Sequence, residues 1–276
     1  MGDVVRIPPD DDARHALLGL GRHVSAERAE RAARLHDYFD LQIRLAEAVA
    51  QQAGRPLSET VTHVTNLYRR CGFGRLDGGS IAPAWGTYTA TLQSLETHAQ
   101  RVAWTQAFFA QSPPEPLPSR EQQFGCFTYD PPDGKGIVRI HFMNRDTDDI
   151  GPLSRSKIET RKHELKEMFT RVRLMHADAK QVRGASWLYH TEAYRRLFPA
   201  VYGDSRAILE GRAQFQGSSS WGQFLDNREG VKPAIREQFL QNLASLNLDR
   251  LWEVFPLPTY TTRAPIRAFY DAYGIR

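Results

Sequence analysis

Cysteine is nearly absent from the 276-residue chain, which has only Cys71 and Cys126. Neither lies in a Cys-x-x-Cys motif or at a Cys/His ligand spacing. This scarcity excludes a disulfide framework and a cysteine-based zinc site. We therefore expect a reducing, cytoplasmic environment in which both thiols are small buried residues.

Long apolar runs are also lacking, and the longest is far shorter than the roughly 20 residues of a membrane span. The first residues, MGDVVRIPPDDDARH, are acidic and contain no apolar core of a signal peptide. We therefore expect a cytoplasmic protein without a membrane partner.

Lysine is scarce, since 30 of the 36 basic residues are arginine, a ratio typical of GC-rich bacterial genes. Residues 1–118 carry 12 Arg and 13 acidic residues, a net charge of −1, and residues 119–276 have a net charge of +5. In the most basic segment, 157–173, acidic residues interleave at helical spacing, as in Glu159–Lys162, which indicates a solvated helix face. Without a known nucleic-acid-binding motif, this modest excess does not predict a nucleic-acid partner.

The common catalytic signatures are missing. We find no nucleophile elbow, P-loop, His-Glu-x-x-His motif or dinucleotide-binding fingerprint. The acidic stretch NRDTDDIG fails as a calcium loop because Asp149 stands at the sixth position, where glycine is needed, and Arg155 at the twelfth. No metal site is predicted.

The segments that are present divide the chain in two. Residues 1–111 show helical periodicity, with Ser25 as a cap of the first long helix, Gly54 as its end and Ser58 as a cap of the next. SPPEPLPSR, residues 112–120, has four prolines in nine residues and predicts a stiff, exposed linker. Residues 121–276 form the second predicted domain.

The second domain shows alternating strand and helix patterns. FGCFTYD and IVRIHFM predict a hairpin, followed by an amphipathic helix, a strand in KQVRGASWLY, a short helix, a strand in SRAILEGRAQF and further helices. The prediction is an α+β protein with a helical N-terminal domain followed by a mixed-sheet α/β domain.

Several short motifs in this order resemble one family. VRIHF, the helix start GPLS, SWLYHTEAYRRLFP and DSRAILEGRAQFQG, within Val138–Gln216, resemble bacterial acyltransferase-like proteins that have a helical N-terminal domain and a GNAT-like C-terminal domain. The resemblance implies a GNAT-like fold and transfer of an acyl group to a small-molecule amine or hydroxyl. It covers under a third of the chain.

One departure from the family bears on the cofactor. GNAT enzymes hold the CoA pyrophosphate on a glycine-rich turn between a strand and a helix, where backbone N–H groups point at the phosphates. The corresponding stretch here, NRDTDDIGPLS, has only Gly151 and three carboxylates, which repel a pyrophosphate. QVRGAS mimics the motif but belongs to a strand. The cofactor is therefore left open between acyl-CoA, another acyl thioester and none.

The candidate site centres on the stretch RGASWLYHTEAYRRLFP, taken as a strand and its end. Ligands in open α/β sheets gather at strand ends. The predicted catalytic residues are His141, Tyr189 and His190, and the predicted substrate contacts are Ser186, Arg183 and, on the polar loop QGSSSWGQFLD, Trp221. The alternative is that the aromatic residues of this stretch form core and the polar groups are satisfied locally.

Two functional hypotheses follow. The first is an acyltransferase-like enzyme acting on a small molecule; the second is a non-catalytic binding or scaffold protein with a degenerate GNAT-like fold. The enzyme requires His141 and His190 to lie within about 12 Å on one face of the sheet, so that both reach one substrate. The sequence leaves the acyl donor and acceptor, the pathway and the oligomeric state open.

Overall fold

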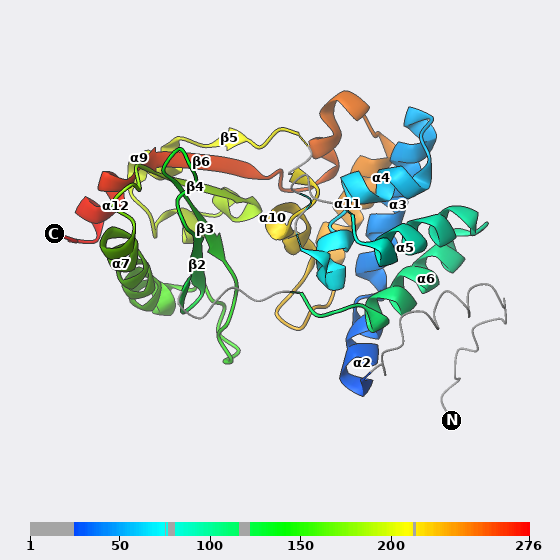
Figure 1. Ribbon diagram of the computed structural model, residues 1–276, viewed down its shortest axis with the longest axis horizontal. Coiled ribbons are helices and arrows are strands. Elements are labelled where there is room, and N and C mark those ends of the chain that lie inside the picture. Colours follow the sequence, from blue (N-terminus) through cyan, green and yellow to red (C-terminus); the bar gives the residue numbers. More distant parts are fainter. Residues whose placement is uncertain (1–24, 75, 77–80, 116–121, 212–213) are drawn as a thin grey trace. The chain divides into compact units, whose positions relative to one another are not determined.

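The computed structural model describes all residues except 1–24, 75, 77–80, 116–121 and 212–213 (Figure 1). It is an α+β protein with two compact units. The helical unit comprises residues up to Pro116 together with Phe215–Gly217 and Phe224–Val254. The sheet unit comprises Leu117–Gln214, Ser218–Gln223 and Phe255–Arg276.

The helical unit is built from two groups of helices, from the beginning and from the later part of the chain. Its principal helices, with η marking short non-α helices, are α2 (Ala26–Arg34), α3 (His36–Ala53), α4 (Leu57–Val64), η1 (Arg69–Phe73), α5 (Pro83–Ser94), α6 (His98–Gln111), α11 (Pro233–Ala244) and η7 (Leu248–Val254).

Local sequence explains where several of these helices begin and end. Ser25 accepts a hydrogen bond from the Arg28 amide and caps α2, and Gly54 ends α3 in the left-handed conformation. The predicted first long helix is interrupted at Leu35, which separates α2 from α3. The predicted cap Ser58 is wrong, because α4 begins at Leu57 after Pro56.

The predicted linker overlaps the helical unit. Ser112 ends α6 and is buried, the Pro113 carbonyl accepts a hydrogen bond from Arg28, and Glu115 pairs with Arg69. These residues pack against the helices instead of forming an exposed spacer. Residues 116–120 of the predicted linker lie outside the described residues.

The segment Phe224–Val254 also differs from its predicted domain. The sequence assigns it to the C-terminal domain, whereas the structure places it in the helical unit, where α11 and η7 both contact α3. The aromatic rings of Phe224 and Phe239 pack edge to face within this segment.

The sheet unit contains a six-stranded mixed sheet in the order β1-β2-β3-β4-β6-β5. Its strands are β1 (Gln123–Phe124), β2 (Phe127–Asp130), β3 (Ile137–Phe142), β4 (Gln181–Ser186), β5 (Ala207–Ile208) and β6 (Tyr260–Pro265). Its helices include α7 (Ile158–Met175), η4 (Trp187–His190), α8 (Glu192–Arg195), α9 (Ala200–Asp204), α10 (Ser218–Trp221) and α12 (Ile266–Ala272).

The predicted hairpin and the predicted strand in KQVRGASWLY are confirmed. β2 pairs antiparallel with β3, and β3 pairs parallel with β4 across the connection through α7. β6 lies between β4 and β5 and is antiparallel to both. The sequence indicates only a short extended piece near Pro258–Thr262, and the fourth predicted strand, in SRAILEGRAQF, is reduced to the two residues of β5.

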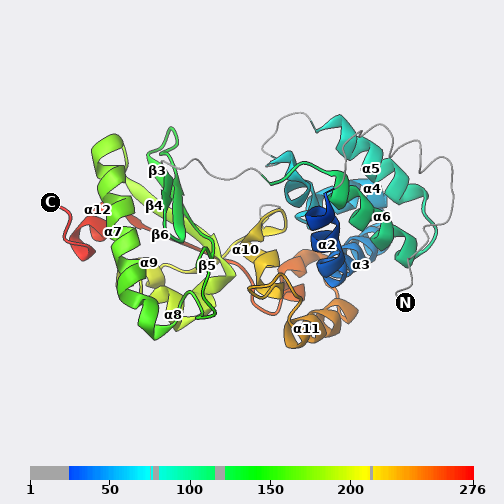
Figure 2. The same cartoon turned by 90° about the horizontal axis from the view of Figure 1, so that it is seen from below.

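The core of the sheet unit lies on one face of the sheet, where α7 and α12 pack (Figure 2). Val138, Ile140, Val182 and Ala264 point into this core from neighbouring strands. Because successive strand residues alternate between faces, the intervening residues of β3, β4 and β6 point to the opposite face. We call this opposite face the open face.

No helix in the described part of the chain is both long and apolar enough to cross a bilayer.

Candidate functional site on the open face of the sheet

Three arginines stand side by side on the open face. Arg139 of β3 pairs in register with Arg183 of β4, and Arg183 pairs in register with Arg263 of β6. Laterally paired residues on one face have Cβ atoms about 5 Å apart. We call Arg139, Arg183 and Arg263 the arginine row.

The arginine row is only partly neutralised. Arg139 forms an ion pair of 3.0 Å with Asp133, and the Arg183 Nε atom donates a hydrogen bond of 3.2 Å to the Thr261 hydroxyl. Among the described residues, neither Arg183 nor Arg263 has an acidic partner within ion-pair distance, and both are exposed. The row therefore carries uncompensated positive charge.

His141 lies on the same face, next to the row. It follows Arg139 by two positions in β3, and its side chain is 45% exposed. Its Nε2 atom is 3.1 Å from an Asp130 carboxylate oxygen of β2. The structure thus brings two predicted site residues, His141 and Arg183, to one surface.

Tyr189 lies elsewhere. It is 1% exposed and belongs to the core on the helix-covered face, where its hydroxyl hydrogen-bonds the Tyr202 hydroxyl at 2.8 Å. Burial raises the pKa of Tyr189 to about 12, although hydrogen bonds from Thr262 and Tyr202 oppose this shift. Its predicted role as an accessible proton donor is therefore wrong for this conformation.

His190 and Ser186 do not form the predicted strand end. The chain turns into the short helix η4 at Trp187, and the Ser186 hydroxyl accepts a hydrogen bond from the Leu188 amide. The His190 ring packs 4.5 Å from that of Tyr260, and its Nε2 atom is 2.7 Å from the Pro258 carbonyl oxygen. Ser186 therefore has a local capping role.

The contact with Tyr260 also fixes the side on which His190 lies. Tyr260 shares the face of Thr262 and Ala264, which point into the core, whereas His141 is on the open face. The predicted arrangement, in which both histidines serve one substrate, is wrong because the sheet separates them.

Trp221 is not on a mobile lid. It ends α10, is 0% exposed and packs edge to face against Phe255 at 5.1 Å. Its predicted role as a substrate contact above a crevice is wrong for this conformation. The Trp221 ring is therefore part of the interior of the sheet unit.

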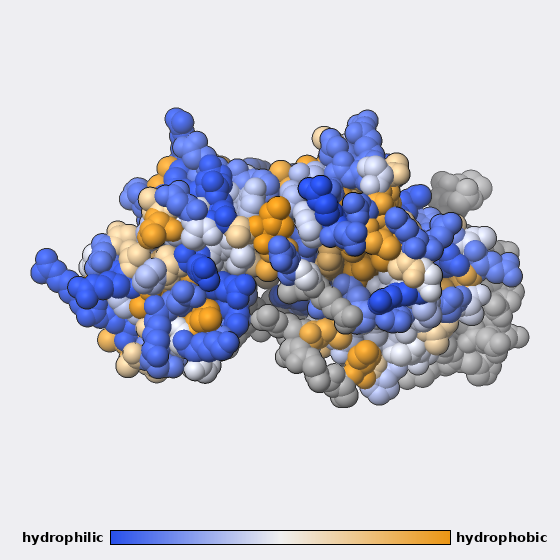
Figure 3. All heavy atoms as spheres, turned by 90° about the horizontal axis from the view of Figure 1, so that it is seen from above, coloured by the Kyte–Doolittle hydropathy of each residue, from blue (hydrophilic) through white to orange (hydrophobic). Residues whose placement is uncertain are grey.

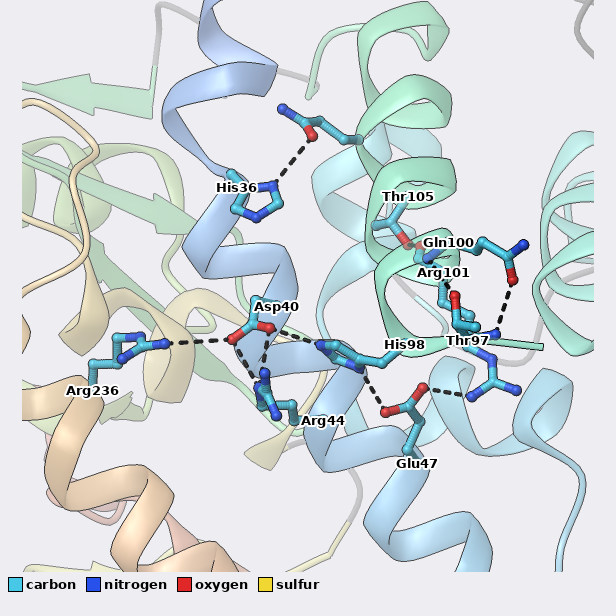
Figure 4. Close-up of polar contacts among 11 residues, drawn as sticks. His36, Asp40, Arg44, Glu47, Thr97, His98, Gln100, Arg101, Thr105 and Arg236 are labelled. Atoms are coloured by element: carbon cyan, nitrogen blue, oxygen red, sulfur yellow. Dashed lines mark hydrogen bonds and ion pairs between the residues drawn. The ribbon is translucent and has the colours of Figure 1, made fainter. Parts of the chain in front are cut away.

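A polar cluster that the sequence did not reveal lies in the helical unit. Figure 4 shows the His98 ring between Asp40 and Glu47, with each ring nitrogen 2.7 Å from a carboxylate oxygen. Arg44 and Arg101 contact the same two carboxylates at 2.9 Å and 2.7 Å. Asp40 and Glu47 are seven residues apart on α3 and lie on the same side of the helix. This spacing is the feature of the sequence from which the two carboxylates could have been predicted to lie close together.

This cluster is built to hold charge in place rather than to move a proton. Each His98 ring nitrogen lies within hydrogen-bond distance of a carboxylate oxygen, so neither faces a free space where a substrate could bind. Burial raises the pKa of Asp40, but hydrogen bonds from Arg44 and His98 outweigh it and lower the pKa overall. The cluster therefore fastens α6 to α3.

A hollow of about 730 Å³ in the helical unit adjoins the cluster through Arg236, which lies 3.9 Å from Asp40. Asp37 and Glu237 also line it, so two carboxylates surround one guanidinium there. Within the described residues, no group of three or more His, Cys, Asp and Glu side chains is placed to hold a metal ion.

The exposed apolar side chains of the described residues are spread over the chain. Hydrophilic side chains cover most of the face shown in Figure 3, with apolar residues in small groups. Exposed large apolar residues, such as Met143, Leu174 and Val201, are scattered along the described chain. Charge is thus the more informative surface property.

A scan against protein-family models gave no match, and searches of curated proteins and of solved structures gave none either. The similarity to GNAT-like proteins therefore stays a prediction from short motifs.

Proposed function

We propose that the protein is a non-catalytic binding protein and that the open face of its sheet binds an acidic segment of a partner protein. The observation that carries this proposal is the arginine row, in which three cations are in register on neighbouring strands. Like charges directly opposite one another destabilise a sheet. An anionic partner offsets that repulsion.

The chemistry of the row favours carboxylates. Arginine presents a planar fork of donors that matches a carboxylate with two parallel hydrogen bonds. Carboxylates of this chain already contact the face, since Asp133 lies 3.0 Å from Arg139 and Asp130 lies 3.1 Å from His141. The other two cations of the row, Arg183 and Arg263, remain for carboxylates from another chain.

Single-stranded nucleic acid fits the face less well. Proteins that bind it usually combine cations with aromatic side chains on which the bases stack. Within strands β1–β6 as described, the open-face positions include no Phe, Tyr or Trp. This composition supports a partner that offers charge without bases.

The acyltransferase hypothesis remains a prediction with less support. Its two predicted proton-transfer groups, His141 and Tyr189, lie on opposite faces of the sheet. An acyltransferase would therefore need a different residue to act as proton donor beside His141. A shift of the thermal unfolding midpoint by acyl-CoA but not by acidic peptide would favour it over binding.

Titration of the purified protein with a fluorescently labelled hexaglutamate peptide at low salt tests the proposal. Reversing the charge of Arg183 and Arg263 in the double variant R183E/R263E should weaken binding about tenfold or more, since each exposed ion pair contributes up to about 1 kcal/mol. Higher salt should weaken wild-type binding because exposed charges are screened.

The matched control is the double variant K162E/K166E on α7, which makes the same change of charge at two exposed residues outside the open face. It should leave the affinity nearly unchanged. If both variants lost the same amount of affinity for the peptide, the loss would come from the change in net charge alone. The open face would then be rejected as the binding site. If the protein bound a hexanucleotide more tightly than hexaglutamate, the proposed ligand of the open face would be nucleic acid and not an acidic protein segment.

A further inference from the structure

The helical unit contains a second arginine cluster, which is independent of the sheet. Arg31 donates two hydrogen bonds to the Glu229 carboxylate, at 2.6 Å and 2.7 Å, and Arg70 donates a third at 2.7 Å. Glu229 reaches these cations from the turn Asp226–Gly230, nearly 200 residues further along the chain than Arg31. We call Arg28, Arg31 and Arg70 the arginine clamp.

Glu229 occupies the clamp in a strained backbone conformation. Its φ is +62°, and it is the only non-glycine residue with positive φ in the described part of the chain. This left-handed region disfavours residues that carry a Cβ atom. The ion pairs between Glu229 and the clamp offset the free-energy cost of this backbone conformation.

The turn keeps its shape by bonds that do not involve the Glu229 side chain. The Asp226 carboxylate accepts hydrogen bonds from the Arg228 and Gly230 amides, both at 2.8 Å. Leu225 and Val231 form a β-bridge across its base. The Glu229 side chain can therefore leave the clamp without the turn unfolding.

The clamp is likewise held without Glu229. Arg28 donates to the backbone carbonyls of Phe109 and Pro113 and lies 4.2 Å from the centre of the Phe109 ring. Arg70 lies over the Tyr38 ring at 5.5 Å. These contacts place the cations in advance, which lowers the cost of binding any anion.

One carboxylate does not saturate this site. Burial lowers the pKa of Arg28, and the neighbouring charges of Arg31 and Arg70 lower it further, as expected where cations outnumber anions. The Arg70 Nε atom is buried and has no hydrogen-bond partner among the described residues. The clamp thus has unused donors and excess positive charge.

We propose that the arginine clamp is a carboxylate-binding site and that Glu229 is its internal ligand, which an external carboxylate displaces. The external group comes either from a small dicarboxylate or from an acidic side chain of a partner protein. The Glu229 side chain is 27% exposed and that of Arg31 32%, so an incoming group can reach both. The internal ligand sets a threshold, because only a carboxylate that binds better than Glu229 remains bound.

The test uses the variant Glu229→Gly, which removes the competing carboxylate and suits the positive φ. Isothermal titration with glutarate and with triglutamate should show binding at least about tenfold tighter than to wild type, because the site is no longer occupied. The second variant, Glu229→Gln, keeps the side-chain size and should show the same gain. Glu229→Gln therefore tests the proposal even if the glycine of Glu229→Gly makes the turn flexible.

Adding Arg31→Ala to Glu229→Gly should abolish the gain, while Arg55→Ala, an exposed arginine on another part of the helical unit, should leave it intact. Tighter binding of triglutamate than of glutarate assigns the ligand to a protein; the reverse order assigns it to a small molecule.

Equal and weak binding to wild type and both folded Glu229 variants would overturn the proposal and leave Glu229 as a structural ion pair. A gain that survives Arg31→Ala would overturn it as well. Failure here leaves the open-face proposal untouched, because Arg183 and Arg263 belong to the sheet unit and are intact in every variant.

Discussion

Gly184 of β4 lies beneath two buried tyrosine hydroxyls. A Cβ atom at this position would overlap the hydroxyl oxygens of Tyr189 and Tyr202, which hydrogen-bond each other. Gly184→Ala should therefore destabilise the sheet unit by about 1–3 kcal/mol, as overpacking of a core typically does. Urea unfolding followed by tyrosine fluorescence measures this change.

Gly151, in the same unit, provides the control. No heavy atom lies within 4 Å of a Cβ atom built there, and its φ is not in the left-handed region. Gly151→Ala should leave the free energy of unfolding unchanged within about 0.5 kcal/mol. Equal effects of the two substitutions would show that the tyrosine pair moves aside easily.

The ion pairs of Glu229 predict a dependence of stability on pH. Burial raises the pKa of Glu229, but the hydrogen bonds from Arg31 and the charge of Arg70 outweigh it, so the folded pKa lies below the unfolded one. A depressed folded pKa contributes stability that is present above the unfolded value and lost as pH falls through the folded value.

Comparison of wild type with Glu229→Gln by thermal unfolding across pH checks this sign. Wild type should be more stable by a constant amount above about pH 5, and the difference should shrink as the pH falls below about 4. A difference that grows on acidification would contradict the assigned shift.

At the scale of elements, the caps of the helices differ in what they contribute. Thr97 and Gln100 form a reciprocal capping box at the start of α6, the helix that carries His98. Thr97→Ala should lower the free energy of unfolding, measured by chemical denaturation, by about 0.5–2 kcal/mol.

Ser58, predicted from sequence as a cap, lies inside α4. Ser58→Ala should therefore have little effect on the free energy of unfolding in the same measurement. A larger loss at Ser58 would restore the predicted cap.

Element types were predictable where the local pattern is strong. α7 and α11 follow from their apolar stripes and from Pro233 in the first turn, and β2 and β3 from alternating residues around a turn. The C-terminal end of β4 and the position of β6 in the sheet could not be predicted in this way. Trp187–His190 has the aromatic composition of a strand, but the Ser186 hydroxyl and tertiary packing favour a tight helical turn.

The same limit applies to the candidate site. His141 and Arg183 lie on neighbouring strands, and that they share a face depends on the pairing register, which the sequence does not specify. Extending β4 by four residues places Tyr189 on the face of Arg183, because successive strand residues alternate between faces. The turn into η4 instead puts Tyr189 in the core. The arginine row requires knowing that β6 pairs with β4, a contact between residues about 80 positions apart.

At the scale of the whole molecule, the helical unit needs the later segment Phe224–Val254. A fragment ending at Pro116 lacks α11 and therefore loses Arg236 beside Asp40 and the packing of α11 on α3. We expect its thermal midpoint, followed by circular dichroism, to lie below that of the full chain. A synthetic peptide of residues 224–254 should raise the midpoint, and a scrambled peptide should not. A fragment as stable as the full chain would contradict this dependence.

The chain changes unit five times between Pro116 and Phe255, and β6, which pairs along the whole of β4, comes after the last of these changes. During synthesis, most proteins complete their domains in order as the chain emerges. Here the helical unit waits for residue 254, and the sheet waits for residues 260–265. Until then β4 presents an unpaired edge that another nascent chain can join. The rate at which the ribosome translates the chain from β4 to β6 therefore sets how long that edge is open to aggregation.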